Sequence, residues 1–133
     1  MALIRSEVKG DVRIIFLDEA RLVDPLAIDQ CYREILDELG KTQERQVLLH
    51  FGRVAFLSSS ALGILIRINK KCKEFKTALK LCNIAPDIFQ VFKITGLDKV
   101  FDIRPDASDA LAAFASAGHS FFRKHGETTY DVR

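Results

Sequence analysis

The sequence has no tryptophan and little cysteine, proline or glycine: its 133 residues include three cysteines, three prolines and seven glycines. An odd number of cysteines (Cys31, Cys72 and Cys82) without a Cys-x-x-Cys spacing makes no disulfide framework, so free buried thiols in a reducing compartment are expected. No apolar run reaches the roughly 18 residues that cross a bilayer, and no basic segment followed by an apolar core opens the chain. We therefore expect a cytoplasmic protein without a membrane span or signal peptide.

The sequence also has no large excess of either positive or negative charge, since it contains 20 lysines and arginines and 18 aspartates and glutamates. A nucleic-acid-binding domain would carry a dedicated basic face, and a formal net charge of +2 gives no sign of one. The apolar share of 48% and the charged share of 29% are those of an ordinary globular protein, and the length favours one domain. Neither nucleic acid nor a membrane is expected among the partners.

The motifs of common cofactor and nucleophile sites are missing too. There is no Gly-x-Gly-x-x-Gly or P-loop sequence, and no Gly-x-Ser-x-Gly elbow surrounds a serine. The histidines His50, His119 and His125 have no cysteines or carboxylates at ligand spacing, which argues against a metal site. A small hydrolase built on a serine and His50 would also need an orienting group and an oxyanion site, and neither is visible. We expect no cofactor, no metal and no catalytic residue.

What the sequence does contain is a regular alternation of short apolar runs and helical patterns. Gly10 lies between two such runs and predicts an opening β-hairpin, and the continuous apolar run at 47–51 is typical of a strand covered on both faces. The expected strands are 4–8, 12–17, 47–51, 78–83 and 100–103. The expected helices are 25–40, the stretch from Ala61 to Phe75, 86–92 closed by Thr95 and Gly96, and a helix capped by Asp106 that ends near Gly118. This order predicts an α/β domain with a mixed, mainly parallel sheet, an N-terminal β-hairpin and about four helices.

Three consecutive serines precede the second of these helices. One serine is expected to be the N-cap, because serine side chains accept hydrogen bonds from the free amides of a helix start. The same amides and the helix dipole favour an anion, so a phosphate on a serine here would be tolerated by the fold. It would add a charge of about −1.5 to −2, enough to disrupt a contact with a partner. Ser58, Ser59 and Ser60 therefore form a candidate switch.

The helix after the serines has an inner and an outer side. Helical spacing places an apolar stripe inside, and we expect it to contain Ala61, Leu65, Ile68, Cys72 and Phe75. The outer side is charged and includes Arg67, Lys70, Lys71 and Glu74. The simplest interpretation of the basic run from Lys70 to Lys76 is a solvated face that could also contribute to partner binding.

Two segments carry a resemblance to a known family. The stretch Phe-Leu-Ser-Ser-Ser-Ala-Leu-Gly at 56–63 is similar to the serine junction of STAS domains of bacterial anti-sigma factor antagonists. Asn83-Ile84-Ala85-Pro86 matches an Asn-x-x-Pro signature, and Thr-Gly-Leu-Asp-Lys at 95–99 follows at the matching distance. The resemblance spans Ile4 to Phe114, so we expect a STAS domain at 1–117 and a C-terminal tail at 118–133.

The resemblance implies a protein-binding switch that is not an enzyme. Such antagonists bind an anti-sigma factor that is itself a serine kinase, and regulate sigma-factor-dependent transcription. The kinase uses its own ATP to phosphorylate the antagonist, the complex dissociates, and a serine phosphatase resets the switch. By position the phosphoacceptor is Ser59, with Ser58 and Ser60 as neighbours. The expected partner-binding residues are Ser58, Ser59, Ser60, Leu62, Ile66, Arg67 and Lys70.

The junction departs from the family pattern at three positions. Ser58 stands where the family has aspartate before the phosphoacceptor, Ala61 replaces a glycine, and His50 replaces an aspartate common near the end of the preceding strand. A carboxylate there would help to orient the serine hydroxyl or accept its proton. These departures favour an alternative: a STAS module that binds its partner constitutively, in a scaffold, a sensory complex or a transporter-associated complex.

Overall fold

The computed structural model describes residues 2–41 and 43–123, with the side chains of the last helix described up to residue 116. Its elements follow one another as strands, helices and one short 3-10 helix. They are β1 (Ile4–Lys9), β2 (Val12–Leu17), β3 (Arg21–Leu22), α1 (Pro25–Lys41), β4 (Gln46–His50), β5 (Phe56–Leu57), α2 (Ser59–Glu74), β6 (Ala78–Cys82), α3 (Pro86–Thr95), η1 (Leu97–Lys99), β7 (Asp102–Arg104) and α4 (Ala107–Arg123).

Five strands form the main sheet, in the order β1-β2-β4-β6-β7. The hairpin strands β1 and β2 are antiparallel, and every other neighbouring pair in this sheet is parallel. Gly10 has a φ of +61° in the hairpin turn, a conformation that glycine adopts without a steric penalty. The predicted mixed, mainly parallel sheet with an N-terminal hairpin and four helices is thus confirmed.

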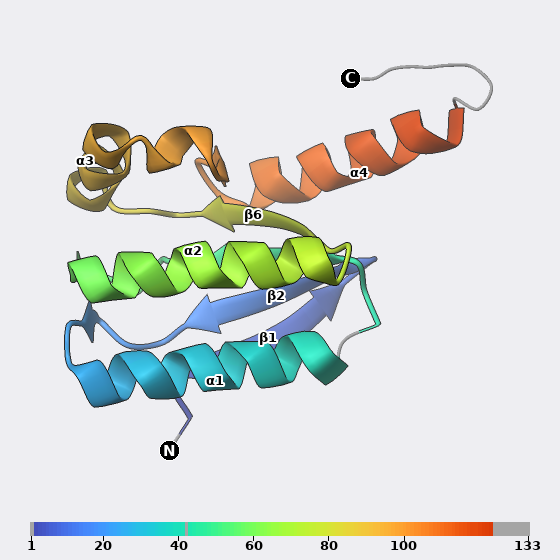
Figure 1. Ribbon diagram of the computed structural model, residues 1–133. Helices are drawn as coiled ribbons and strands as arrows, with labels where there is room; N and C mark the ends of the chain where they lie inside the picture. The colour runs from blue at the N-terminus through green and yellow to red at the C-terminus, as the bar shows by residue number, and fades with distance from the viewer. Residues whose placement is uncertain (1, 42, 124–133) are drawn as a thin grey trace.

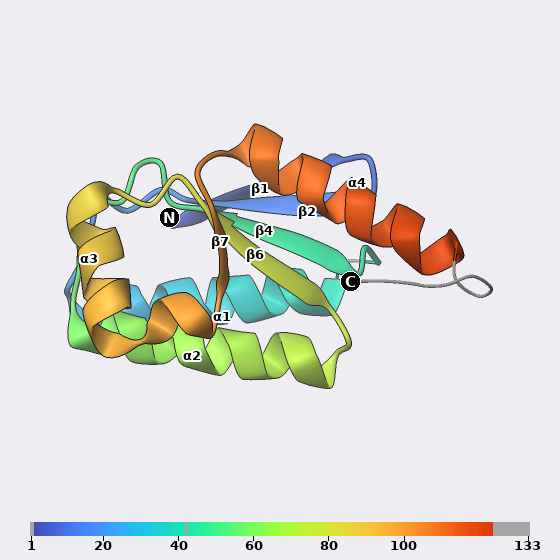
Figure 2. The ribbon, with the colours of Figure 1, turned by 90° about the horizontal axis from the view of Figure 1, so that it is seen from above.

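Helices cover both faces of the sheet unequally. Figure 2 shows α1 and α2 on one face and α4 on the other, while α3 lies near the carboxyl ends of the strands. The larger core lies on the side of α1 and α2 and contains Ile15, Val47, Leu49 and Leu81 from the strands. A smaller core under α4 is built around Phe114 and Ala110. Both α1 and α2 begin near the carboxyl ends of the parallel strands (Figure 1).

The helix ends follow from local chemistry. Asp24 Oδ2 accepts a hydrogen bond from the backbone N–H of Ala27 at 3.0 Å, and Asp106 Oδ1 accepts one from Asp109 at 2.8 Å. These are N-cap interactions, which each contribute about 1 kcal/mol. Gly96 ends α3 with a φ of +78°, as glycine commonly does at a helix C-terminus.

Three expectations about the elements need correction, and one pair of strands was not predicted. Phe75 was placed on the inner stripe of α2, but the helix ends at Glu74 and the Phe75 side chain is 46% exposed. The last strand is 102–104 rather than 100–103, because η1 and the turn after it occupy the residues before Phe101. Helix α4 continues past Gly118 to Arg123. The short parallel pair β3–β5 was not expected. The tail at 118–133 stays a prediction, since residues 124–133 lie outside the described part of the chain.

Candidate functional site

The serine junction is tied to a segment distant in sequence. After β4 the chain turns at Phe51–Val54 and enters β5, which pairs with β3 in parallel. The backbone N–H of Ser58 then donates to Leu22 O at 3.0 Å. The start of α2 is therefore held at the carboxyl edge of the sheet by hydrogen bonds to the residues that precede α1.

The three serines have different roles in the geometry. Ser58 is the N-cap: its backbone is extended, and its Oγ accepts a hydrogen bond from the N–H of Ala61 at 3.2 Å. Ser59 and Ser60 are the first two residues of the helix and are exposed. Within the described part of the chain, neither of their hydroxyls has a hydrogen-bond partner. Ser58 is thus engaged in the fold, while two hydroxyls face solvent at the positive end of the α2 dipole.

His50 is the last residue of β4 and is half-buried. Its Nδ1 accepts a hydrogen bond from the backbone N–H of Gly52 at 3.1 Å, and its ring lies 4.8 Å from the ring of Phe16. Burial lowers the pKa of His50, and the nearby positive charge of Arg5 lowers it further. The arrangement favours a neutral imidazole that supports the turn before the junction, with no serine hydroxyl among its hydrogen-bond partners in the residues described.

The expected partner-binding residues do not share one face of α2. Ile66 is 40% exposed, and Lys70 is exposed on the same flank. Arg67 lies on the flank that faces α1, with its guanidinium 4.5 Å above the ring of Tyr32. Leu62 was expected on the exposed side, but its side chain is 8% exposed and packs in the core. The expected exposure of Leu62 is wrong, because helical spacing puts Leu62 on the same side as the core residue Leu65, three positions later. Its contact with a partner stays a prediction.

A groove beside the serines was missed by the sequence analysis. It runs between the first turns of α1 and α2 and has a volume of about 380 Å³. Its lining residues are Pro25, Ile28, Asp29, Ser60, Gly63, Ile64 and Arg67. Each helix pattern is readable in sequence, but the pairing of the two helix starts arises only when both helices pack on the same face of the sheet.

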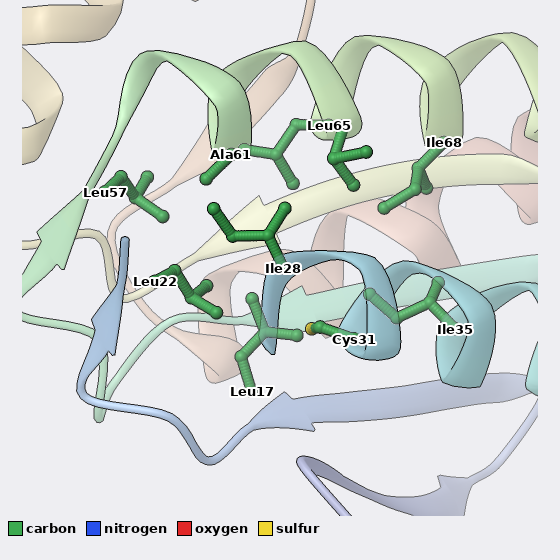
Figure 3. A pocket seen from close by; sticks show the side chains of 10 residues that line it. Leu17, Leu22, Ile28, Cys31, Ile35, Leu57, Ala61, Leu65 and Ile68 are labelled. Carbon is green, nitrogen blue, oxygen red and sulfur yellow. The ribbon is translucent and has the colours of Figure 1, made fainter. Parts of the chain in front are cut away.

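A small apolar cavity lies beneath this groove, between α1, α2 and the sheet (Figure 3). It has a volume of about 20 Å³, and side chains from β2, β3, β5 and both helices converge on it. Such a space is about the size of one water molecule, and apolar walls give a water no hydrogen bonds. Burial raises the pKa of the Cys31 thiol, which lines this cavity, to about 12. The cavity is therefore a packing defect and too small for an organic ligand.

Neither a metal site nor a membrane-spanning helix is found among the described residues. No group of three histidine, cysteine, aspartate or glutamate side chains is placed to hold a metal ion in residues 2–41 and 43–116, whose side chains the structure describes. Over residues 2–41 and 43–123, no helix has the length and apolar character needed to cross a bilayer.

The mixed sheet, the helices on its two faces and the serine junction at the start of α2 define an α/β domain of the STAS type. A family model for the STAS domain matches residues 4–110, so the chain belongs to the STAS domain family. A Bordetella bronchiseptica protein named as an anti-sigma factor antagonist, BtrV, is 29% identical over 96 residues, which are 72% of this chain and 82% of that protein.

Solved structures share the fold. An anti-sigma-factor antagonist (STAS) domain protein from Planctomyces limnophilus is 29% identical, with a TM-score of 0.73 over 85% of this chain and 98% of that one. The phosphorylated form of the Bacillus cell fate determinant SpoIIAA superposes with a TM-score of 0.62 over 84% of this chain and 98% of that one, at 20% identity. At that identity the second likeness shows the fold alone.

Proposed function

We propose that this protein is an anti-sigma factor antagonist, which binds a serine-kinase anti-sigma factor and is released when the kinase phosphorylates Ser59. The relatives named as anti-sigma factor antagonists support the general role. The proposal that Ser59 is the phosphorylated residue depends on the different roles of the three serines in the structure. Ser58 caps the helix, whereas the hydroxyls of Ser59 and Ser60 are exposed and have no partner within the described residues.

In this proposal the protein is a substrate of its partner and not itself an enzyme. The partner supplies ATP, the Oγ of Ser59 attacks the γ-phosphorus, and ADP leaves. The hydroxyl proton needs an acceptor, yet residues 50–63 contain no aspartate or glutamate. We therefore place the proton acceptor on the kinase. A serine phosphatase would later hydrolyse the phosphoserine and restore binding.

Phosphorylation would act locally. The phosphate adds a charge of about −1.5 to −2 next to the free amides of α2, where a helix tolerates an anion. The fold would therefore persist, while the surface presented to the partner changes in charge and shape. Release would follow from this mismatch and needs no unfolding of the domain.

The decisive experiment incubates the protein with ATP and each serine-kinase anti-sigma factor encoded in the same genome, purified in turn. Mass spectrometry then locates the phosphate. We expect it on Ser59, and the variant Ser59→Ala should lose most of it while Ser60→Ala retains it. Absence of phosphate from all three serines with every kinase would exclude the switch.

The missing carboxylate at the junction favours a second candidate, a STAS module that binds its partner constitutively in a scaffold, sensory or transporter-associated complex. Ser58 occupies the position where an acidic residue would assist phosphorylation. Binding measurements on Ser59→Ala and Ser59→Asp separate the two candidates. Loss of binding in Ser59→Asp alone supports the switch, whereas unchanged binding in both variants supports the constitutive module.

A further inference from the structure

We infer that the groove between α1 and α2 is a docking site for an apolar side chain of the anti-sigma factor that has a carboxylate next to it. This inference rests on the proposed function, and extends the contact surface from the serines onto α1. The groove lies directly beside the junction, because Ser60 is one of its lining residues. A partner that reaches Ser59 must therefore cover the groove or leave an apolar surface uncovered.

The shape of the groove depends on Gly63. This residue lies within α2 and its backbone has no special φ, so the helix itself has no need of a glycine there. A Cβ added at Gly63 would have no atom within 4 Å, which means that the missing side chain leaves open space. Glycine inside a helix costs about 1 kcal/mol relative to alanine. The absent side chain makes room between Ile64, Ser60 and the first turn of α1.

The walls indicate which chemistry fits. Pro25, Ile28 and Ile64 supply apolar surface, which suits a leucine-like or methionine-like side chain. Arg67 is the basic lining residue, and within the described residues no carboxylate pairs with its guanidinium, which lies over the ring of Tyr32. The one acidic lining residue, Asp29, is already paired with Arg33 at 3.1 Å. The unpaired charge in the groove is therefore positive, and a carboxylate next to the inserted apolar side chain would complement it.

The residues at the base of the groove have space to move into. Ile28 and Ile64 line both the groove and the apolar cavity below it. A side chain pressed into the groove would push these two residues toward the cavity instead of into packed atoms. A well-packed core would resist such a shift, because interiors have few voids. The cavity thus allows the groove to accept side chains of somewhat different size.

The test compares two helical glycines, Gly63 in the lining of the groove and Gly40, which is near the end of α1 and is not a lining residue. Gly63→Ala and Gly63→Leu fill the groove in two steps. Gly40→Ala and Gly40→Leu make the same changes near the end of α1, where an added Cβ also has no atom within 4 Å. Affinity is measured with the kinase that binds the wild type, chosen from the purified serine-kinase anti-sigma factors of the same genome. We expect the Gly63 variants to bind at least tenfold more weakly, leucine more so than alanine, and the Gly40 variants to bind as wild type does. Circular dichroism and the thermal midpoint show that each variant is folded.

A second readout needs no substitution. Isotope labelling of isoleucine methyl groups reports where the kinase binds on the wild-type protein, and the largest changes are expected at Ile28 and Ile64. Equal affinities for the Gly63 and Gly40 variants, or shifts centred on Ile94 of α3, would overturn the groove proposal and leave the proposed function standing. If no kinase binds the wild type, the proposed function fails and the groove proposal fails with it.

Discussion

At the scale of single residues, the serine junction shows what sequence patterns can and cannot decide. The pattern predicted an N-cap among three adjacent serines, and the structure assigns that role to Ser58 through its hydrogen bond to Ala61 N–H. Sequence alone could not choose among the three, because each is compatible with a helix start. The choice depends on where β5 ends and α2 begins, and this is set by the backbone pairing of Ser58 with Leu22.

Removing the cap should therefore destabilise the fold, whereas removing the neighbouring hydroxyls should not. We expect Ser58→Ala to lower the free energy of unfolding by about 1 kcal/mol, since it leaves a helix amide without its partner. Ser58→Asp should largely preserve stability, because aspartate is an equally good N-cap. Ser59→Ala should stay within about 0.5 kcal/mol of wild type. Urea denaturation measures all three, and equal losses for Ser58→Ala and Ser59→Ala would contradict the assigned roles.

His50 provides a pH-dependent test at the same scale. Its pKa in the folded protein is lowered from 6.5, so the folded state favours the neutral ring. The stabilisation is present above pH 6.5 and is lost as the pH falls through the folded pKa. We expect the free energy of unfolding to decrease over that range below pH 6.5. His50→Asn keeps an acceptor for Gly52 N–H but does not titrate, so the part of the decrease due to His50 should be absent. An unchanged pH profile in this variant would show that His50 is not responsible.

At the scale of elements, the strands and helices were predictable where the apolar period was clear. The hairpin around Gly10 and the helix cap at Asp106 were predicted from local chemistry and are confirmed, and Asp24 caps α1 in the same way. The two-residue pair β3–β5 was invisible, because so short a strand has no period of its own. Phe75 and Leu62 were misplaced because sequence spacing shows neither where a helix ends nor which neighbouring element covers each position. The apolar stripe was continued to Phe75, past the end of α2, and Leu62 was expected to be exposed although it packs in the core.

The two glycines inside helices allow a prediction about α1 and α2. Gly63→Ala should raise the free energy of unfolding by about 0.5–1 kcal/mol, since alanine is the better helix former and meets no atom within 4 Å. Gly40→Ala should raise it by less, because Gly40 is next to the last residue of α1, where the helix interior ends. Thermal or urea unfolding measures the gain. Gly52→Ala is the contrasting case, because its added Cβ would lie 2.7 Å from His50 Cε1 and should destabilise the protein. Destabilisation by Gly63→Ala would contradict the open space that the structure shows beside Gly63.

At the scale of the whole molecule, the three cysteines report on the integrity of the core. All are buried and free, and burial raises the pKa values of Cys31, Cys72 and Cys82 to about 12, 11 and 12. Thiolates are the reactive form, so burial suppresses reaction twice, through access and through ionisation. The sequence predicted free buried thiols, but it could not place Cys31 at a cavity between α1, α2 and the sheet.

We therefore expect none of the three thiols to react rapidly with a chromogenic disulfide reagent at pH 8 in the native protein. All three should react in denaturing urea, and at intermediate urea concentrations their reactivity should rise together with the loss of helical circular dichroism. Early reaction of one thiol, identified by mass spectrometry, would show that its layer opens before the rest of the domain unfolds.

The pairing of β3 with β5 has a consequence for the proposed phosphorylation of Ser59. Ser59 is displayed by a surface assembled from two stretches of chain, one before α1 and one before α2, joined by backbone hydrogen bonds. A synthetic peptide spanning residues 54–65 would contain the acceptor serine but neither the pairing strand nor the opposite wall of the groove. A kinase that reads this surface would leave such a peptide unmodified. Its targets would then be found by comparing folded surfaces, and a search for a linear consensus around the serine would miss them.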